Sequence, residues 1–446
     1  MIPLPPNAGE QCYSLIERLY PICRSITGDG VRETLRIVRE SIPLEIREVP
    51  SGEQAFDWTI PKEWNIRDAY VIGPDGRKAI DFKRNNLHVL NYSRPFRGRI
   101  SKEELSKHLF TLPEYPDWVP YRTSYHQENW GFCLSHNDFL KLGDGIYEVM
   151  IDSTLEDGSL TYGEYYIHGR KPEEMLISCH VCHPSLCNDN LSGISVAVML
   201  ARLLSEVKPE YSYRFLFVPA TIGAIAWLAA NKDKTEAIRY ALVLTLLGDG
   251  GKFHYKRSAR GNSSMDKIVE YALKASGFSY EIRDFSPYGY DERQYCSPGF
   301  NLPAGCLMRT PHGEFPEYHT SADNLEFVRP EYLHESCEVA TRIVNLVDIN
   351  KRYVNMNPFC EPQLGKRGLY QQISGESQSS QKERQLSILW ALNQSDGSRD
   401  LVDIAIRSGM PAESLHWAVK QLEQNELLKE ADEIPEKIIH HFRNHL

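Results

Sequence analysis

The clearest pattern in the chain is a short apolar run that ends abruptly at polar, metal-ligating residue types. Met175 to Ser178 reads as a buried strand, and a polar, turn-rich segment follows it. From Gly193 onward the apolar residues recur at helical spacing. The pattern predicts a strand, a loop and a helix, with the loop at the carboxyl end of the strand. Ligands bind at such loops in open α/β sheets.

The same alternation continues along the chain and predicts the fold class. Amphipathic spacing predicts helices over 9–22 and 31–40, before an alternating strand at 44–49. Further on, the patterns predict strands at 165–167, 175–178, 213–218 and 241–247, and helices at 193–207, 222–231, 265–276 and 330–347. Strands that alternate with helices in this way predict an α/β fold: a three-layer, mixed and largely parallel sheet with helices on both faces.

Two changes in residue composition and pattern along the chain predict its domain boundaries. Residues 59–159 carry many aromatics, prolines and short β-like runs, which predicts an inserted, mostly-β domain between 1–58 and 160–350. Residues 351–380 read as a linker because they are rich in Gly, Ser and Gln near their end. Three short amphipathic segments in 381–446 predict a winged helix-turn-helix domain.

Composition and charge narrow the classes of partner. The 446 residues have a net charge of −10, and residues 381–430 hold six basic and eight acidic side chains. We therefore expect no nucleic-acid partner despite the winged helix. No apolar run is long enough to span a bilayer, so no membrane association is expected. The N-terminus lacks a basic region followed by an apolar one, which predicts a cytoplasmic location with free thiols; a homo-oligomer remains open.

Candidate metal ligands gather in the loop after the first strand described above. His180, His183 and Asp189 lie within ten positions of one another, and imidazole nitrogen and carboxylate oxygen are both zinc ligands. Cys179 and Cys182 are spaced as in half of a zinc ribbon, but the chain has no second Cys-x-x-Cys. Buried, inert thiols are the simpler interpretation.

Three segments together resemble the zinc aminopeptidases with co-catalytic metals. They are the strand that ends at His180, Asn-Asp-Asn-Leu-Ser-Gly at 188–193, and Tyr-His-Thr-Ser-Ala-Asp-Asn at 318–324. The match covers about 9–58 and 160–350. The whole chain looks like a group of bacterial aminopeptidase-like proteins with an inserted β domain and a C-terminal winged helix.

The resemblance implies a function and a ligand set. His180, Asp189 and His319 would be zinc ligands. The protein would be a zinc-dependent hydrolase, an aminopeptidase or amidohydrolase that cleaves an amide or peptide bond in a small, peptide-like substrate. Metal-activated water would be the nucleophile, and a Glu would be the general base.

The chain departs from that family at three positions. The aminopeptidases carry a Glu-Glu pair, which supplies the base and a ligand of the second metal, where this chain has Ala220 and Thr221. They also carry a metal-binding Asp where this chain has Thr245. One zinc per chain is therefore expected rather than two. His183 either completes the ligand set or lies behind it.

The missing base has to come from elsewhere in the chain. Glu292 is the first candidate and Asp291 the second, unless the pair forms a salt bridge with Arg293 or Arg283. Asp249 is a further possible ligand, although its Gly-rich surroundings read first as a turn.

Two residues are expected to bind substrate, and two other functions remain open. Arg122, among aromatic residues, would grip a substrate carboxylate unless it is a surface arginine. Tyr290 lies in the aromatic loop before the two carboxylates.

The alternatives to a hydrolase are a catalytically degenerate binding or regulatory protein and, against the local charge, a DNA-reading regulator.

Overall fold

The computed structural model describes residues 2–125, 127–370 and 378–433. Parts of the predicted linker (371–377) and of the predicted winged helix (434–446) lie outside these residues. The chain divides into two compact units. The first comprises Met1–Asp266 and Ser276–Thr341, and the second Lys267–Ala275 and Arg342–Leu446. The domain boundaries predicted from the sequence stay predictions.

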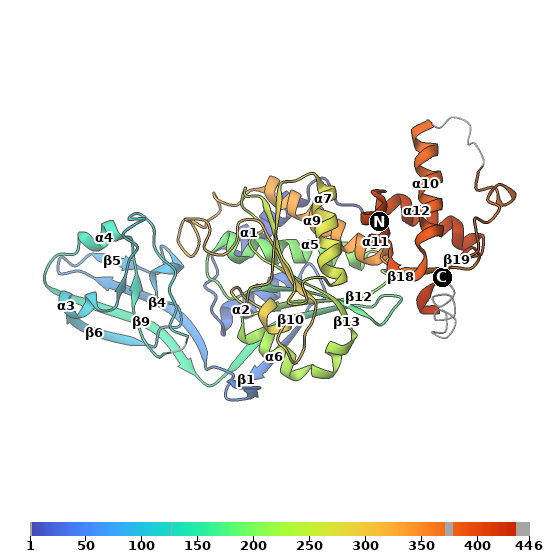
Figure 1. Cartoon of the computed structure of the whole chain (residues 1–446). Coiled ribbons are helices and arrows are strands. Elements are labelled where there is room, and N and C mark those ends of the chain that lie inside the picture. Colours follow the sequence, from blue (N-terminus) through green and yellow to red (C-terminus); the bar gives the residue numbers. More distant parts are fainter. Residues whose placement is uncertain (1, 126, 371–377, 434–446) are drawn as a thin grey trace. The chain divides into compact units, whose positions relative to one another are not determined.

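An eight-stranded mixed sheet forms the centre of the first unit (Figure 1). Its four middle strands, β12, β11, β13 and β16, run parallel, while β10 and β14 pair with them antiparallel. Every residue of β11 and β12 is buried, as a strand covered on both faces requires. In spatial order the strands are β1 (Glu45–Pro50), β10 (Ser159–Ile167), β12 (Ser212–Val218), β11 (Glu174–His180), β13 (Ile238–Leu244), β16 (Ala304–Met308), β14 (Phe253–Lys256) and β15 (Tyr280–Arg283).

Helices cover both faces of this sheet, which confirms the predicted α/β class. Figure 1 shows α5 and α9 on one side of the strands and α6 on the other. Leu176, Leu216 and Val243 of the sheet pack with Trp227 of α6 in one buried cluster. The helices are α1 (Ala8–Leu19), α2 (Asp29–Arg39), α5 (Gly193–Ser205), α6 (Ile222–Ala230), η3 (Lys232–Ala237), α7 (Ser264–Ser276), α8 (Glu292–Tyr295) and α9 (Pro330–Ile349).

The segment between β1 and β10 is mostly β structure, as its texture predicts. Its main sheet has the order β5-β4-β9-β6 and is antiparallel throughout. Residues of β9 alternate between buried and more exposed positions, because only one face of this sheet meets a core. The elements are β2 (Gln54–Ala55), β3 (Trp58–Thr59), β4 (Glu63–Ile72), β5 (Lys78–Asp81), η1 (Asn86–His88), β6 (Phe96–Ser101), α3 (Lys102–Ser106), β7 (Leu109–Phe110), β8 (Phe132–Cys133), α4 (His136–Leu140) and β9 (Ile146–Glu156).

The second unit contains a winged helix, as predicted. Helix α11 begins at a capping box in which Asp400 and Asp403 each accept the other's backbone N–H, and it ends at Gly409 with φ of 70°. A three-stranded sheet, β18-β17-β19, completes the unit. The elements are β17 (Arg352–Asn355), η4 (Gly365–Arg367), α10 (Gln378–Gln394), β18 (Asp396–Asp400), α11 (Leu401–Ser408), α12 (Ala412–Gln424), β19 (Leu428–Glu430) and η5 (Ala431–Glu433).

Across the part of the chain that the structure describes, no helix combines the length and the apolar character needed to cross a bilayer.

Candidate active site

The candidate site lies where three neighbouring parallel strands end. Strand β11 ends at His180, the chain after β12 leads to Ala220 and Thr221, and Thr245 follows β13 directly. Because β11 pairs in parallel with both β12 and β13, these positions share one edge of the sheet. This is the carboxyl edge, where open α/β sheets bind ligands.

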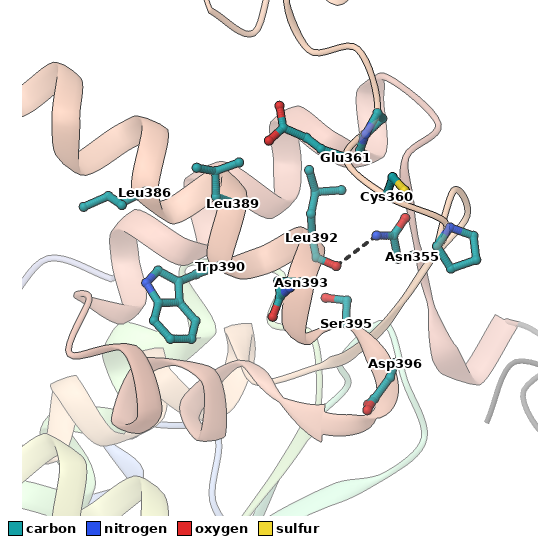
Figure 2. Close-up of a pocket in the computed structure, with 12 residues that line it drawn as sticks. Asn355, Cys360, Glu361, Leu386, Leu389, Trp390, Leu392, Asn393, Ser395 and Asp396 are labelled. Carbon is teal, nitrogen blue, oxygen red and sulfur yellow. Dashed lines mark hydrogen bonds between the residues drawn. The ribbon is translucent and has the colours of Figure 1, made fainter. Parts of the chain in front are cut away.

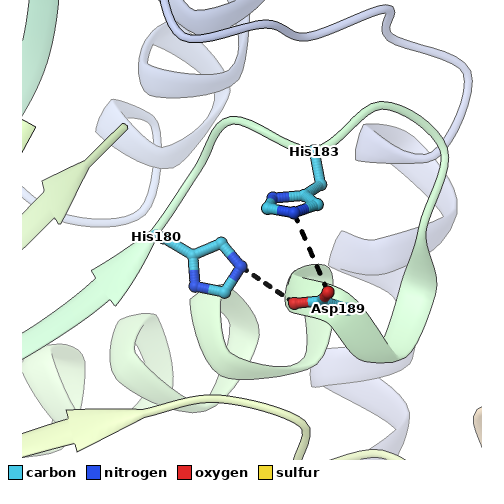
Figure 3. A group of neighbouring side chains, drawn as sticks. All are labelled: His180, His183 and Asp189. Atoms are coloured by element: carbon cyan, nitrogen blue, oxygen red, sulfur yellow. Dashed lines mark hydrogen bonds and ion pairs between the residues drawn. The ribbon is translucent and has the colours of Figure 1, made fainter. Parts of the chain in front are cut away.

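Asp189 is the centre of the site, and three imidazoles surround it. His180 Nε2 lies 2.9 Å from Asp189 Oδ1, and His319 Nε2 lies 3.0 Å from Oδ2. His183 Nε2 is 3.8 Å from Oδ2 (Figure 3). The Asp189 side chain is fully buried. The structure thus brings together all four residues predicted as metal ligands, with His180 and His319 on different oxygens of one carboxylate.

A buried carboxylate holds the backbone of the Asp189 loop. The loop is the turn η2 (Cys187–Ser192). Asp323 accepts hydrogen bonds from the backbone N–H groups of Asn188 and Asp189, at 2.6 and 2.9 Å. Asp323 belongs to the aminopeptidase-like segment 318–324, so this segment meets the segment 188–193 here. Asp323 had no role among the residues predicted from sequence, and only its position after His319 could have indicated one.

The remaining polar residues of the loop bind neighbouring backbone. The Asn190 amide donates to the carbonyls of His180 and Leu244, and its Oδ1 accepts from Gly193 N. A Cβ on Gly193 would lie 2.3 Å from that Oδ1, so only glycine fits. These contacts account for the Asn-Asp-Asn-Leu-Ser-Gly pattern as a way of fixing Asp189.

Asp249, considered as a further ligand, is part of the same scaffold. It accepts from Asn188 Nδ2 at 2.9 Å, from Thr310 Oγ1 at 2.7 Å and from Gly251 N at 2.7 Å. Its oxygens are therefore occupied by neutral donors of the turn.

The electrostatics of the centre favour an anionic Asp189 beside a neutral His183. Burial raises the pKa of Asp189, but the charge of His183 and the hydrogen bonds from His180 and His319 outweigh burial and hold this pKa well below its usual range. Burial lowers the pKa of His183 well below its ordinary value. Neutral imidazoles and an ionised carboxylate are the protonation states that a metal ion requires.

A pocket of about 350 Å³ opens beside the three imidazoles. His183 and His319 line it, together with aromatic residues from the β insertion and from the loop before α8. The insertion meets the site directly, because Tyr121 N donates to His319 O at 2.7 Å. The aromatic lining residues are Trp58, Tyr121, Tyr125 and Tyr290.

Tyr290, predicted to bind substrate, faces the metal-ligand candidates. Its hydroxyl lies 3.3 Å from His319 Nε2, 3.4 Å from His183 Nε2 and 3.0 Å from the Tyr318 hydroxyl. Its ring stacks on His180 with centroids 4.5 Å apart. Burial raises its pKa well above the ordinary tyrosine value, so the hydroxyl keeps its proton and can donate to a ligand. His312 packs against the same ring but does not line the pocket.

Glu292 and Asp291, the candidate bases, are buried and do not line the pocket. Glu292 pairs with Lys256 at 2.5 Å and accepts from Tyr290 N. The ion pair therefore forms with Lys256, not with Arg293 or Arg283. Both Asp291 oxygens lack a hydrogen-bond partner in the described residues, and burial raises the Asp291 pKa to about 7. The base role of either residue is untested, and the pairing of Glu292 with Lys256 outside the pocket lining argues against it for Glu292.

The two arginines considered near the site lie differently relative to the pocket, and the substrate role of Arg122 stays a prediction. Arg122 is exposed and is not among the pocket's lining residues. Arg293, expected only as an ion-pair partner, does line the pocket.

The part of the pocket lining formed by Ala220 and Thr221 carries no carboxylate. Ala220 and Thr221 both line the pocket at the place where the aminopeptidases have their Glu-Glu pair. Thr245 is fully buried, and its hydroxyl has no hydrogen-bond partner in the described residues. The positions that would complete a two-metal site therefore lack acidic side chains.

Further hollows lie in the described residues, and two of them are large enough to compare with this pocket. One, of about 370 Å³, adjoins the first through Trp58 and is lined by Phe56, Asp57, Leu228, Lys232 and Phe300 among others. The other, of about 510 Å³, lies within the winged-helix unit (Figure 2) and is lined by Leu386, Leu389 and Trp390 of α10 and by Cys360 among others. Neither brings together a set of metal-ligating side chains in the described residues.

The donor set of the Asp189 centre fits a metal ion. Within the described ranges, the group of potential ligands that converges comprises His180, His183 and Asp189, whose donor atoms lie within 4.8 Å of one another. A buried carboxylate among imidazoles, with His180 Nδ1 left without a partner, is the chemistry of a nitrogen- and oxygen-ligated zinc site. The open pocket beside it leaves access for a further ligand.

Comparisons with known proteins agree with this fold. Residues 13–350 match the family described as "Domain of unknown function (DUF4910)", and residues 351–430 match a winged helix-turn-helix family. The chain is 52% identical to a Clostridium acetobutylicum protein over 95% of this chain and 97% of that one. That protein is named "Putative polysaccharide biosynthesis protein with aminopeptidase-like domain".

Solved structures extend the likeness. The crystal structure of a "putative peptidase" from Clostridium acetobutylicum has a TM-score of 0.89 at 51% identity, and the match covers 95% of this chain and 96% of that one. The zinc aminopeptidase of Bacillus subtilis has a TM-score of 0.55 at 14% identity, covering 77% and 95%. The second match shows a shared fold, as the sequence resemblance predicts.

Proposed function

The chain belongs to the family described as "Domain of unknown function (DUF4910)" and has the aminopeptidase fold, and from this we propose that it is a zinc-dependent hydrolase of an amide bond in a small substrate. One observation supports the proposal above all. Asp189 is buried and holds His180 on one oxygen and His319 on the other. A chain without a metal would have no physical need for this arrangement, because burying a carboxylate among imidazoles is costly.

Zinc would be held by His180, Asp189 and His319, with His183 as a fourth donor close to the same carboxylate. The chemistry that zinc supplies when bound to such ligands is polarisation of a carbonyl and a lowered pKa of water. We propose one ion per chain, since Ala220, Thr221 and Thr245 offer no carboxylate for a second.

The chain's own residues orient the substrate. Tyr290 keeps its proton and directs its hydroxyl toward the imidazole cluster, so it is placed to donate to the amide oxygen, where negative charge develops. Tyr121 and Tyr125 of the insertion line the same pocket and limit it to a small substrate. Asp323 and Asn190 hold Asp189 in place through the loop backbone and restrict its motion.

A second function is favoured by a specific observation. Ala220 and Thr221 bring no carboxylate to the pocket, which favours a protein that binds a small molecule without cleaving it. The relative's name, a polysaccharide biosynthesis protein, would be compatible with either function.

Elemental analysis of the purified chain tests the proposal. We expect about one zinc per chain and its loss in His319→Ala, while the exposed His168→Ala keeps it. Release of a primary amine from a panel of small amides should depend on that zinc. A wild-type protein that binds no zinc at neutral pH would remove the hydrolase proposal and leave the binding function.

A further inference from the structure

The pocket beside the imidazoles has no acidic side chain on its surface. Its lining residues include neither Asp nor Glu, and Asp189 beneath them is fully buried with both oxygens bound to imidazoles. A free ammonium group on a substrate would meet imidazoles and a guanidinium but no counter-charge. The desolvation of such an ammonium would therefore go uncompensated.

Arg293 supplies a permanent positive charge to this pocket. Its Nη1 donates to Gly289 O at 3.1 Å, and no carboxylate of the described residues lies within ion-pair distance of it. Of the acidic residues next to it in sequence, Glu292 pairs with Lys256, and the fully buried Asp291 feels the charge of Arg293 but forms no ion pair with it. The guanidinium is therefore available for an anion.

The loop that leads into α8, the short helix that carries Arg293, is firmly held. Lys256 Nζ is bonded to Ser286 O at 3.1 Å, to Tyr288 O and to Glu292 Oε1 at 2.5 Å. A Cβ on Gly289 would lie 2.1 Å from Glu292 Oε1, so the loop packs tightly over this pair. A pre-organised guanidinium loses little entropy on binding a carboxylate and can do so through two parallel N–H groups.

We propose that this pocket takes a carboxylate-bearing N-acyl compound, with the carboxylate against Arg293 and no free ammonium beside the scissile bond. The inference rests on the hydrolase function proposed above and names its substrate class. In the reaction, water adds its oxygen to the acyl carbon and the C–N bond breaks. The nitrogen takes a proton and leaves as an amine, and the acyl group leaves as a carboxylic acid. Acylated amino acids and acylated amino sugar acids share this chemistry.

The test uses matched pairs of probes on the full chain. N-acetyl-L-alanine is compared with its neutral amide, and N-acetylmuramic acid with neutral N-acetylglucosamine, while L-alanine amide carries the free ammonium. Binding is measured by calorimetry with and without zinc. At least one acid should bind about tenfold or more tightly than its neutral partner, as a hydrogen bond to a charged group predicts, and L-alanine amide should bind weakest. The pair that shows the difference identifies the source of the carboxylate.

Variants assign the effect to Arg293. Arg293→Gln should abolish the preference for the acid, Arg293→Lys should keep part of it, and the exposed Arg97→Gln in β6 should leave it unchanged. If Arg293→Gln does not fold, the wild-type pairs decide. Equal binding of acids and neutral partners, or an undiminished preference in Arg293→Gln, would overturn the inference.

The two proposals fail in different ways. Zinc binding and amine release without any acid preference would remove only the substrate class. An acid preference in a protein that holds no zinc and releases no amine would remove the hydrolase and keep the binding site.

Discussion

The two walls of the candidate pocket differ in how much of the aminopeptidase chemistry they retain. On one wall His183 and the partly exposed His319 line the pocket, and the fully buried Asp189 behind them contacts His180 and His319 on different oxygens. On the other wall Ala220 and Thr221 stand where the related fold carries two glutamates. Both walls are built from the ends of adjacent strands of one sheet, β11 and β12.

The contrast shows that ligand positions on one scaffold can be lost separately. The imidazole wall is fixed by many bonds, among them those from Asp323 and Asn190 to the loop backbone. The opposite wall depends on side chains that only need to fill space beside the pocket. Replacing acidic side chains by others at these two positions therefore has little effect on the stability of the fold, while it changes which ligands the pocket can bind.

The largest expected effect comes from the imidazole wall. Asp189→Asn removes the charge that both His180 and His319 contact, so the zinc content should fall from about one per chain to near zero. Since a metal ion supplies several kcal/mol of transition-state stabilisation and about 1.36 kcal/mol is tenfold in rate, turnover should drop roughly a thousandfold. Elemental analysis and amine release measure both. Asp144→Asn, at a fully exposed side chain, is the control, and retention of zinc by Asp189→Asn would contradict the central role of this carboxylate.

The next effect concerns Tyr290, whose hydroxyl lies near His183 and His319. Tyr290→Phe removes one hydroxyl donor beside the imidazoles and should lower kcat about a hundredfold, with zinc content and KM nearly unchanged. Tyr288→Phe, in the same loop but exposed, should behave as wild type. A loss of zinc in Tyr290→Phe would mean that the hydroxyl supports the ligands instead of the substrate.

The carboxylates that the site lacks at Ala220, Thr221 and Thr245 can be restored by mutation. Ala220→Glu and Thr221→Glu combined with Thr245→Asp should raise the zinc content from about one to about two per chain, because these carboxylates restore the base and both missing ligands of a two-metal site. The triple variant should also begin to cleave an aminoacyl anilide, whose ammonium gains a counter-charge. The matched variant with Gln, Gln and Asn at these positions should gain neither property. If the triple variant still holds one zinc, the missing side chains do not explain the single-metal site.

The smallest effect on turnover is expected at Glu292. Glu292→Gln breaks the buried pair with Lys256 and should lower the free energy of unfolding by about 1–3 kcal/mol while turnover changes less than about threefold. Thermal unfolding and amine release test this. Glu281→Gln, which breaks exposed ion pairs with Lys252 and Arg283, should leave the free energy of unfolding nearly unchanged. A hundredfold loss of turnover with zinc retained would instead make Glu292 the general base that the sequence suggests.

The sequence by itself determined the elements and the ligand candidates. The buried strand that ends at His180, the helix from Gly193 and the Asn-Asp-Asn segment between them were readable, because local periodicity and residue type are properties of neighbouring positions. The mostly-β texture of the insertion and the caps of the winged helix are local in the same sense.

Tertiary structure alone decided which distant side chains meet. Asp323 binds the Asp189 loop from 134 positions away, Lys256 engages Glu292 across 36, and Arg293 lines the pocket while Arg122 faces solvent. A charged side chain is equally compatible with a surface, an ion pair or a pocket when it is seen only in sequence. Its role depends on which groups lie within contact distance of it in the folded chain. Long-range packing brings those groups together, and local sequence patterns do not record it.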